Sequence, residues 1–144
     1  MKILPLIFIV MFLDLVTKYY IVKTMSEGMS IPVIDGIFHI TYILNAGAAF
    51  GMLENQRMVF IAVALLLSVF FVGYFKSILK EPLLFQLGVG LLMGGALGNL
   101  IDRIRLGKVI DFLDFRIWPV FNVADIAICV GAGLILWEVL HKKD

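Results

Sequence analysis

Cysteine and histidine are scarce in this sequence, which limits the chemistry available to it. One cysteine, Cys129, occurs among 144 residues, so no intrachain disulfide and no CxxC metal or redox site can form. The two histidines, His39 and His141, lie far apart, and neither belongs to an HExxH zinc motif. These absences argue against zinc, thiol and serine-histidine catalysis, and we predict no metal and no cofactor.

Charge is also sparse and nearly balanced. Only 16% of the residues are charged, and the net charge of +1 at pH 7 gives no basic surface for nucleic acid. Hydrophobic residues make up 62% of the chain, whereas roughly 45 to 50% is usual in a soluble domain. A chain this apolar needs lipid as its solvent.

Four apolar segments approach the roughly 20 residues that a helix needs to cross the hydrocarbon core. They are residues 4–22, 58–75, 83–101 and about 120–140. We therefore predict an all-α membrane protein with four transmembrane helices in a single domain, residues 1–144. Both termini then lie on one side of the membrane, and the long links 23–57 and 102–119 lie on the other. The flanking basic residues are nearly balanced, so they do not decide which side is cytoplasmic.

The first long link has the pattern of a β-hairpin. The runs IPVI and IFHITYIL flank Asp35-Gly36, a dipeptide suited to a tight turn. Alternate residues of the second run would share one apolar face, namely Phe38, Ile40, Tyr42 and Leu44. That face lies either against the bilayer surface or a substrate, or against the protein's own helices, and the sequence leaves both alternatives open.

Small residues mark two places of close approach. The stretch NAGAAFGM surrounds Asn45 with small side chains, which would let another chain come near. In the third apolar segment, Gly90, Gly94 and Gly98 repeat every four residues, the spacing by which membrane helices pack backbone to backbone. We predict a structural role for these glycines.

Ionisable residues within the apolar segments need a partner or a purpose, because each costs at least about 2.5 kcal/mol near the bilayer centre. Asp14 and Lys18 are four residues apart on one helix face and can pair. The pair is either structural or a support for a nearby site. A second functional class remains open, a small proton-coupled exporter in which Asp14 carries the proton.

The densest group of polar residues runs from GNLIDRIRLGKVIDF to FNVAD. Asn99, Asp102 and Arg103 are spaced i, i+3 and i+4, so they project from one helix face. Asn122 and Asp125 repeat the i, i+3 spacing where the fourth apolar segment begins. The two groups are expected to meet at one membrane edge.

Asp111 lies between these two groups in the sequence. Because Gly107 and Pro119 break the chain, we expect Asp111 to fold back over the helix ends toward Asp125. Two neighbouring carboxyl groups suit peptide hydrolysis, since their like charges separate the two pKa values and leave one acid protonated while the other activates water. Alternatively the acids only neutralise nearby basic residues, or the chain is a non-catalytic scaffold. Transporters hold coupling acids near the bilayer midplane, so acids at the membrane edge favour hydrolysis over transport.

Five short blocks, taken in order, resemble the bacterial lipoprotein signal peptidases, also called signal peptidase II. They are DLVTK, NAGAAF, GGALGNLIDR, VIDF and FNVAD, and the resemblance covers nearly the whole chain. It implies a four-helix aspartic protease of the bacterial cytoplasmic membrane. It also implies cleavage of diacylglyceryl-modified prolipoproteins just before the lipidated cysteine, an extracytoplasmic active site and cytoplasmic termini.

The resemblance assigns roles to particular residues. The family's catalytic dyad falls on Asp111 and Asp125. The substrate-site positions are Asn45, Asn99, Arg103 and Asn122, and the supporting positions are Asp14, Lys18 and Asp102. The expected partners are prolipoprotein substrates and membrane lipid, with no nucleic acid and no obligate protein partner. Asp114, just past VIDF, is expected to be a loop charge that tolerates asparagine.

Overall fold

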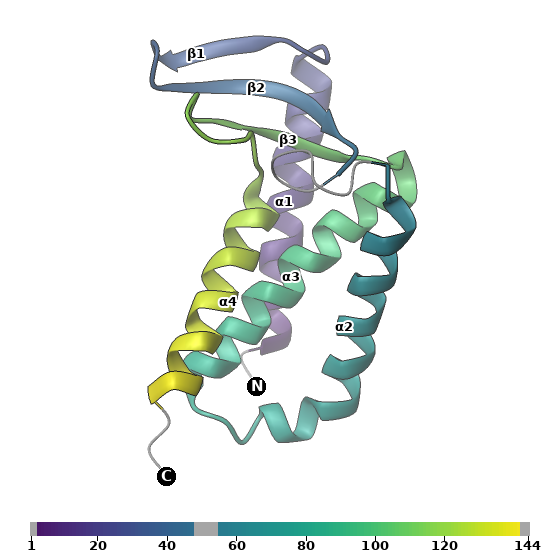
Figure 1. Cartoon of the computed structure of the whole chain (residues 1–144), viewed down its shortest axis with the longest axis vertical. Helices are drawn as coiled ribbons and strands as arrows, with labels where there is room; N and C mark the ends of the chain where they lie inside the picture. Colours follow the sequence, from purple (N-terminus) through teal and green to yellow (C-terminus); the bar gives the residue numbers. More distant parts are fainter. Residues whose placement is uncertain (1–2, 48–54, 142–144) are drawn as a thin grey trace.

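Four long helices form the body of the molecule. The structure is a computed structural model, and it describes residues 3–47 and 55–141. The helices are α1 (Ile3–Thr24), α2 (Arg57–Ile78), α3 (Leu83–Leu106) and α4 (Val123–His141). Each is long and apolar enough to cross a membrane. A small sheet covers one end of the bundle, and the start of α1 and the end of α4 lie at the other end (Figure 1). The predicted four-helix membrane architecture is confirmed.

Helix α3 packs against α1 and α4 through glycines on two of its faces. A Cβ atom added at Gly94 would lie 2.7 Å from Cβ of Val10 in α1. A Cβ atom added at Gly95 would lie 2.4 Å from the backbone oxygen of Ala124 in α4. Real Cβ atoms do not approach so closely, so these helices meet at this distance only because the side chains are missing. The predicted packing role of the glycine ladder is confirmed.

The sheet has three antiparallel strands in the order β1-β2-β3. Strands β1 (Ser30–Ile34) and β2 (Phe38–Asn45) form the predicted hairpin, and Gly36 in its turn has a φ of 69°, which suits glycine. Strand β3 (Val109–Asp114) contains the VIDF block and pairs with β2, placing Asp111 opposite Ile43. The sequence predicted only that this segment folds back over the helices. The third strand is therefore an addition to the prediction.

The apolar face of β2 packs on the protein itself. Tyr42 is buried in a cluster with residues of α1's end and β3, and Ile40 and Leu44 pack against that cluster. The other buried members of the cluster are Met25, Ile110 and Phe112. Phe38, at the start of the strand, lies against Phe115 with ring centroids 4.8 Å apart. Of the two alternatives left open by the sequence, packing on the protein's own core is the one observed.

Candidate active site

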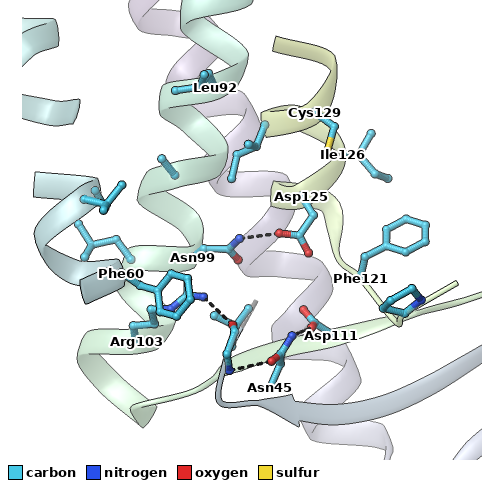
Figure 2. A pocket seen from close by; sticks show the side chains of 18 of the residues that line it. Asn45, Phe60, Leu92, Asn99, Arg103, Asp111, Phe121, Asp125, Ile126 and Cys129 are labelled. Atoms are coloured by element: carbon cyan, nitrogen blue, oxygen red, sulfur yellow. Dashed lines mark hydrogen bonds between the residues drawn. The ribbon is translucent and has the colours of Figure 1, made fainter. Parts of the chain in front are cut away.

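Two acids from separate elements meet beneath the sheet. Asp111 comes from β3, and Asp125 comes from the first turn of α4. Asn122 connects them, because its side-chain Nδ2 donates to Asp111 Oδ1 at 2.7 Å and its backbone N–H donates to Asp125 Oδ2 at 3.2 Å. Figure 2 shows both carboxyl groups turned toward the same space. The structure thus brings the two predicted acids together.

The FNVAD block explains how α4 presents its acid. Asn122 Oδ1 accepts a hydrogen bond from the Asp125 backbone N–H at 2.9 Å, while the Asp125 carboxylate accepts one from the Asn122 N–H. This reciprocal arrangement is a capping box, which satisfies N–H groups that a helix leaves unpaired at its start. The same two side chains therefore begin the helix and fix the direction of the Asp125 carboxylate.

The surroundings of Asp111 favour its protonated form. Its side chain is only 1% exposed, and burial raises its pKa to about 7, assisted by the negative charge of Asp125. Hydrogen bonds from Asn122 and from Asn45 Nδ2, which donates to Asp111 Oδ2 at 2.9 Å, oppose this rise. Asp125 is partly exposed and accepts a hydrogen bond from Asn99 Nδ2 at 2.8 Å. The two acids therefore differ in burial and in their donors.

Arg103 holds the chain that follows β2. Its Nη2 donates to the backbone oxygen of Gly47 at 3.1 Å, and its guanidinium group lies 4.2 Å from the ring centre of Phe60 in α2 (Figure 2). Such a cation–π contact helps to anchor the charge beside an apolar wall. Asn45 Oδ1 accepts the Gly47 N–H at 2.9 Å, so this part of the NAGAAFGM block is fixed from two sides. The remainder of that block, residues 48–52, lies outside the described residues.

A cavity of about 700 Å³ opens in front of the two acids. Its polar end is lined by both acids together with Asn45, Asn99 and Arg103. Its remaining wall is mostly apolar and comes from α2, α3 and α4, with contributions such as Phe60, Leu67, Leu92, Ile126 and Val130. The arrangement suits an extended, largely apolar ligand with one polar segment near the acids.

Comparison with known proteins identifies the family. A family model described as signal peptidase (SPase) II matches residues 6–141. This chain belongs to the signal peptidase II family. The predicted resemblance is confirmed, and membership favours a membrane-bound peptidase over the exporter and scaffold alternatives.

Relatives and solved structures match this chain over nearly its full length. The lipoprotein signal peptidase of Pelotomaculum thermopropionicum is 49% identical over 140 residues, which cover 96% of this chain and 91% of the relative. That of Moorella thermoacetica is 44% identical, with 97% and 93% covered. A solved bacterial membrane enzyme is 35% identical with a TM-score of 0.87, covering 99% of this chain and 92% of its own.

Asn122 differs from the other predicted substrate-site residues of this chain. Its side chain is fully buried, and it is not part of the cavity wall to which Asn45, Asn99 and Arg103 contribute. Its amide group is engaged on both its nitrogen and its oxygen by groups of the protein. Asn122 therefore contacts both acids, and its predicted contact with substrate stays a prediction.

The supporting residues form one buried ionic cluster. Lys18 Nζ lies 2.7 Å from Asp14 Oδ2, which confirms the predicted pair, and 2.8 Å from Asp102 Oδ2. Asp14 reaches this position because Gly98 has no side chain, and a Cβ atom there would lie 2.5 Å from Asp14 Oδ2. Asp14 Oδ1 also accepts the backbone N–H of Ala124 at 2.9 Å. The fully buried, paired Asp14 is thus poorly suited to carry protons along a transport path.

Asp114 is not the loop charge that the sequence predicted. It lies in β3 and is buried, with Thr41 Oγ1 donating to its Oδ2 at 2.7 Å. Arg116 pairs with it through Nη1 at 2.8 Å, and donates its backbone N–H as well. Burial raises the pKa of Asp114, but these donors outweigh burial and lower it. Asp114 therefore fastens β3 to β2, and the loop-charge prediction is wrong.

The histidines lie at opposite ends of the molecule, as predicted, since His39 is in β2 and His141 ends α4 (Figure 1). One contact was missed: the Ser30 hydroxyl lies 3.1 Å from His39 Nδ1 across the hairpin. Ser30 also bonds Thr41 at 2.7 Å, and neither Ser30 nor His39 lines the cavity. Within residues 3–47 and 55–141, no three His, Cys, Asp or Glu residues are grouped so as to hold a metal ion.

Proposed function

We propose that this chain is a membrane aspartic endopeptidase that removes signal peptides from diacylglyceryl-modified prolipoproteins, cleaving just before the lipidated cysteine. The shared name of its relatives, lipoprotein signal peptidase, supports the substrate class. The observation that carries the aspartic mechanism is the pairing of Asp111 and Asp125 through Asn122, beside an apolar cavity.

In the proposed mechanism the two acids have different roles. Asp111, whose pKa is raised by burial to about 7, holds a proton and donates it as a hydrogen bond to the scissile carbonyl oxygen. Asp125, as a carboxylate, takes a proton from a water molecule that attacks the carbonyl carbon. Collapse of the tetrahedral intermediate breaks the C–N bond, and Asp125 passes its proton to the cysteine nitrogen. The products are the signal peptide carboxylate and a free amine on the lipidated cysteine.

The cavity accounts for the proposed selection of substrate. Asn45, Asn99 and Arg103 line its polar end, where they are placed to contact the peptide backbone around the scissile bond. The apolar wall between α2, α3 and α4 suits the hydrophobic part of a signal peptide and the acyl chains of the modified cysteine. We propose that the substrate enters from the lipid and that the site faces the extracytoplasmic side.

A cleavage assay with matched precursors tests the proposal. The purified protein is incubated with a diacylglyceryl-modified prolipoprotein and, separately, with the same precursor lacking the lipid. We expect the lipidated precursor to be cleaved far faster, with mass spectrometry placing the new N-terminus at the modified cysteine, because anchoring fixes the scissile bond near the acids. Equal rates for the two precursors would contradict the proposed substrate.

A chelator distinguishes the proposed acid–base mechanism from a metal-assisted one. Hard cations bind oxygen ligands such as the carboxylates found here, so the possibility has a chemical basis. We expect EDTA to leave the rate with the lipidated precursor unchanged. Strong inhibition that is reversed by adding a divalent cation would instead indicate a metal-assisted mechanism.

A further inference from the structure

Lys18 Nζ has three close polar partners. An ammonium group carries three N–H donors and no acceptor. Its Nζ lies 2.7 Å from Asp14 Oδ2, 2.8 Å from Asp102 Oδ2 and 3.0 Å from Asn99 Oδ1. The residue is 1% exposed, so water does not compete for these positions. Two of the partners are anions that balance charge, but the third is a neutral amide, which charge balance does not require.

The contact with Lys18 decides which way the Asn99 amide points. Because an ammonium group can only donate, Asn99 must turn its oxygen toward Lys18 and its Nδ2 toward Asp125, to which it donates at 2.8 Å. Asn122 Nδ2 donates to the same Asn99 oxygen at 3.1 Å. The oxygen of Asn99 is therefore held by two donors, one from α1 and one from the start of α4.

The same constraint passes on to the second acid. With its Nδ2 directed at Asn99 Oδ1, Asn122 donates that group to Asp111 Oδ1 as well, at 2.7 Å, and leaves its own oxygen for the Asp125 N–H. Asp125 and Asp111 thus each accept a hydrogen bond from an asparagine amide, Asn99 and Asn122 respectively, and the contact with Lys18 fixes the orientation of both amides. If Asn99 turned over, its oxygen would lie against the Asp125 carboxylate in place of a donor.

We propose that Lys18 is a positioning residue for the reaction, which orients the Asn99 amide and, through it, Asn122 and the two acids. The proposal rests on the proposed function, in which Asp111 and Asp125 hydrolyse the peptide bond. Lys18 does not line the cavity, so it can reach the acids only through Asn99 or through its charge, which lowers the pKa of Asp111.

Loss of the Lys18 donor should shift the pH dependence of activity in a definite direction. The groups that interact with Asp125 are Asn99, Asn122, the charge of Arg103 and Asp111. Those that interact with Lys18 are Asp14, Asp102, Asn99 and, through charge, Asp111. Without the ammonium group the Asn99 amide is free to turn its oxygen toward Asp125, and that oxygen favours a protonated Asp125. The base is then available only at higher pH, so the acidic limb of the pH profile should move to higher pH.

A charge-compensated variant separates positioning from charge balance. Lys18→Met removes the cation and its donor, whereas the double variant Lys18→Met with Asp102→Asn restores the net charge of the cluster and still lacks the donor to Asn99. Asp102→Asn alone provides the baseline for the double variant. Each is assayed for kcat/KM against pH with the lipidated precursor, and each is checked by thermal unfolding.

We expect the double variant to be less stable than Asp102→Asn, because buried Asp14 loses its cation. Where it folds, we expect it to be slower than Asp102→Asn by roughly tenfold to a hundredfold, with its acidic limb at higher pH. A double variant with the rate and pH profile of Asp102→Asn would overturn the proposal and leave Lys18 a charge-balancing role.

If Lys18→Met does not fold in either background, Asn99→Asp replaces it, since it keeps an oxygen for Lys18 but offers Asp125 no N–H. That variant should show the same displaced limb, and an unchanged limb would overturn the proposal. Failure of the proposed function is distinguishable, because it would appear as full activity of Asp111→Asn or Asp125→Asn.

Discussion

At the scale of single residues, the two proposed catalytic acids are chemically identical and differ only in their surroundings. Asp111 is buried in a strand and accepts hydrogen bonds from two asparagine side chains. Asp125 is more open and is held by Asn99 and by the helix start that it caps. Such a difference is what allows one acid to keep its proton while its neighbour acts as a base.

Replacing either acid should abolish turnover. Asp111→Asn and Asp125→Asn each remove one of the two carboxyl groups that the proposed mechanism uses, the first as hydrogen-bond donor to the carbonyl oxygen and the second as base, so each should lower kcat by several orders of magnitude. Because the pair acts as a unit, the double variant should be hardly slower than either single one. The measurement is single-turnover cleavage of the lipidated precursor at matched protein abundance.

The control for this experiment must avoid Asp114, which is buried and paired with Arg116. Asp35 is a better choice, since it is exposed in the turn between β1 and β2, and Asp35→Asn should keep nearly full activity. Thermal unfolding is needed for Asp111→Asn, because that side chain is buried and its replacement could lower stability. Near wild-type turnover by a folded Asp111→Asn or Asp125→Asn would refute the dyad.

Activity should decline as the pH rises through about 7. Burial and the charge of Asp125 raise the pKa of Asp111 to about 7, so Asp111 is protonated below that pH and ionised above it. Since the proposed mechanism needs the protonated form, kcat/KM should fall about tenfold for each further pH unit once a single proton has been lost. A profile of kcat/KM that stays flat to about pH 9, with the protein still folded, would contradict the assignment of the proton to Asp111.

Residue identities were easier to predict from the sequence than residue environments. The pairing of Asp14 with Lys18 follows from helical spacing, and the meeting of Asp111 with Asp125 follows from the chain breaks and the family motifs. The full burial of Asn122 and the hydrogen bond between Thr41 and Asp114 could not be predicted from the sequence, because they depend on contacts between segments distant in sequence. No local pattern records such contacts.

At the scale of elements, helices were predicted well because each carries its own signal in length and apolar composition. Strand β3 was not predicted because it is short and forms by pairing with β2, which lies more than sixty residues earlier in the chain. Pairing with β2 is also what places Asp111 in the sheet, opposite Ile43. The glycine spacing of α3, by contrast, predicted a close helix contact that the structure contains.

The close contact between α1 and α3 should be sensitive to a single methyl group. In Gly94→Ala the new Cβ would lie 2.7 Å from Cβ of Val10, so the helices must separate or shift, at a cost of about 1–3 kcal/mol. We expect a lower midpoint of thermal unfolding in detergent. Gly73→Ala in α2 is the matched control, since nothing lies within 4 Å of its added Cβ, and alanine favours a helix over glycine by about 0.5–1 kcal/mol. Equal midpoints for the two variants would show that the contact is looser than described.

At the scale of the whole molecule, the sheet and both acids lie at one end of the helix bundle, and the α2–α3 turn lies at the other with the start of α1 and the end of α4 (Figure 1). The two ends of the molecule therefore differ, and this difference alone is compatible with either orientation in the membrane. The balanced basic residues do not decide the orientation either, since orientation follows the asymmetry of Lys and Arg between the two sides. We propose that the end with the two acids faces the extracytoplasmic side, as the family resemblance implies.

Thiol labelling in intact cells tests that orientation. The native thiol Cys129 is exposed and is first removed by Cys129→Ser. A cysteine is then introduced either by Asp35→Cys in the β1–β2 turn or by Lys80→Cys between α2 and α3, two exposed positions at opposite ends of the bundle. A membrane-impermeant maleimide should label the Asp35→Cys variant in intact spheroplasts and the Lys80→Cys variant only after permeabilisation, since the reagent does not cross the hydrocarbon core. The reverse pattern would place the two acids in the cytoplasm and would contradict both the proposed orientation and access of the acids to exported precursors.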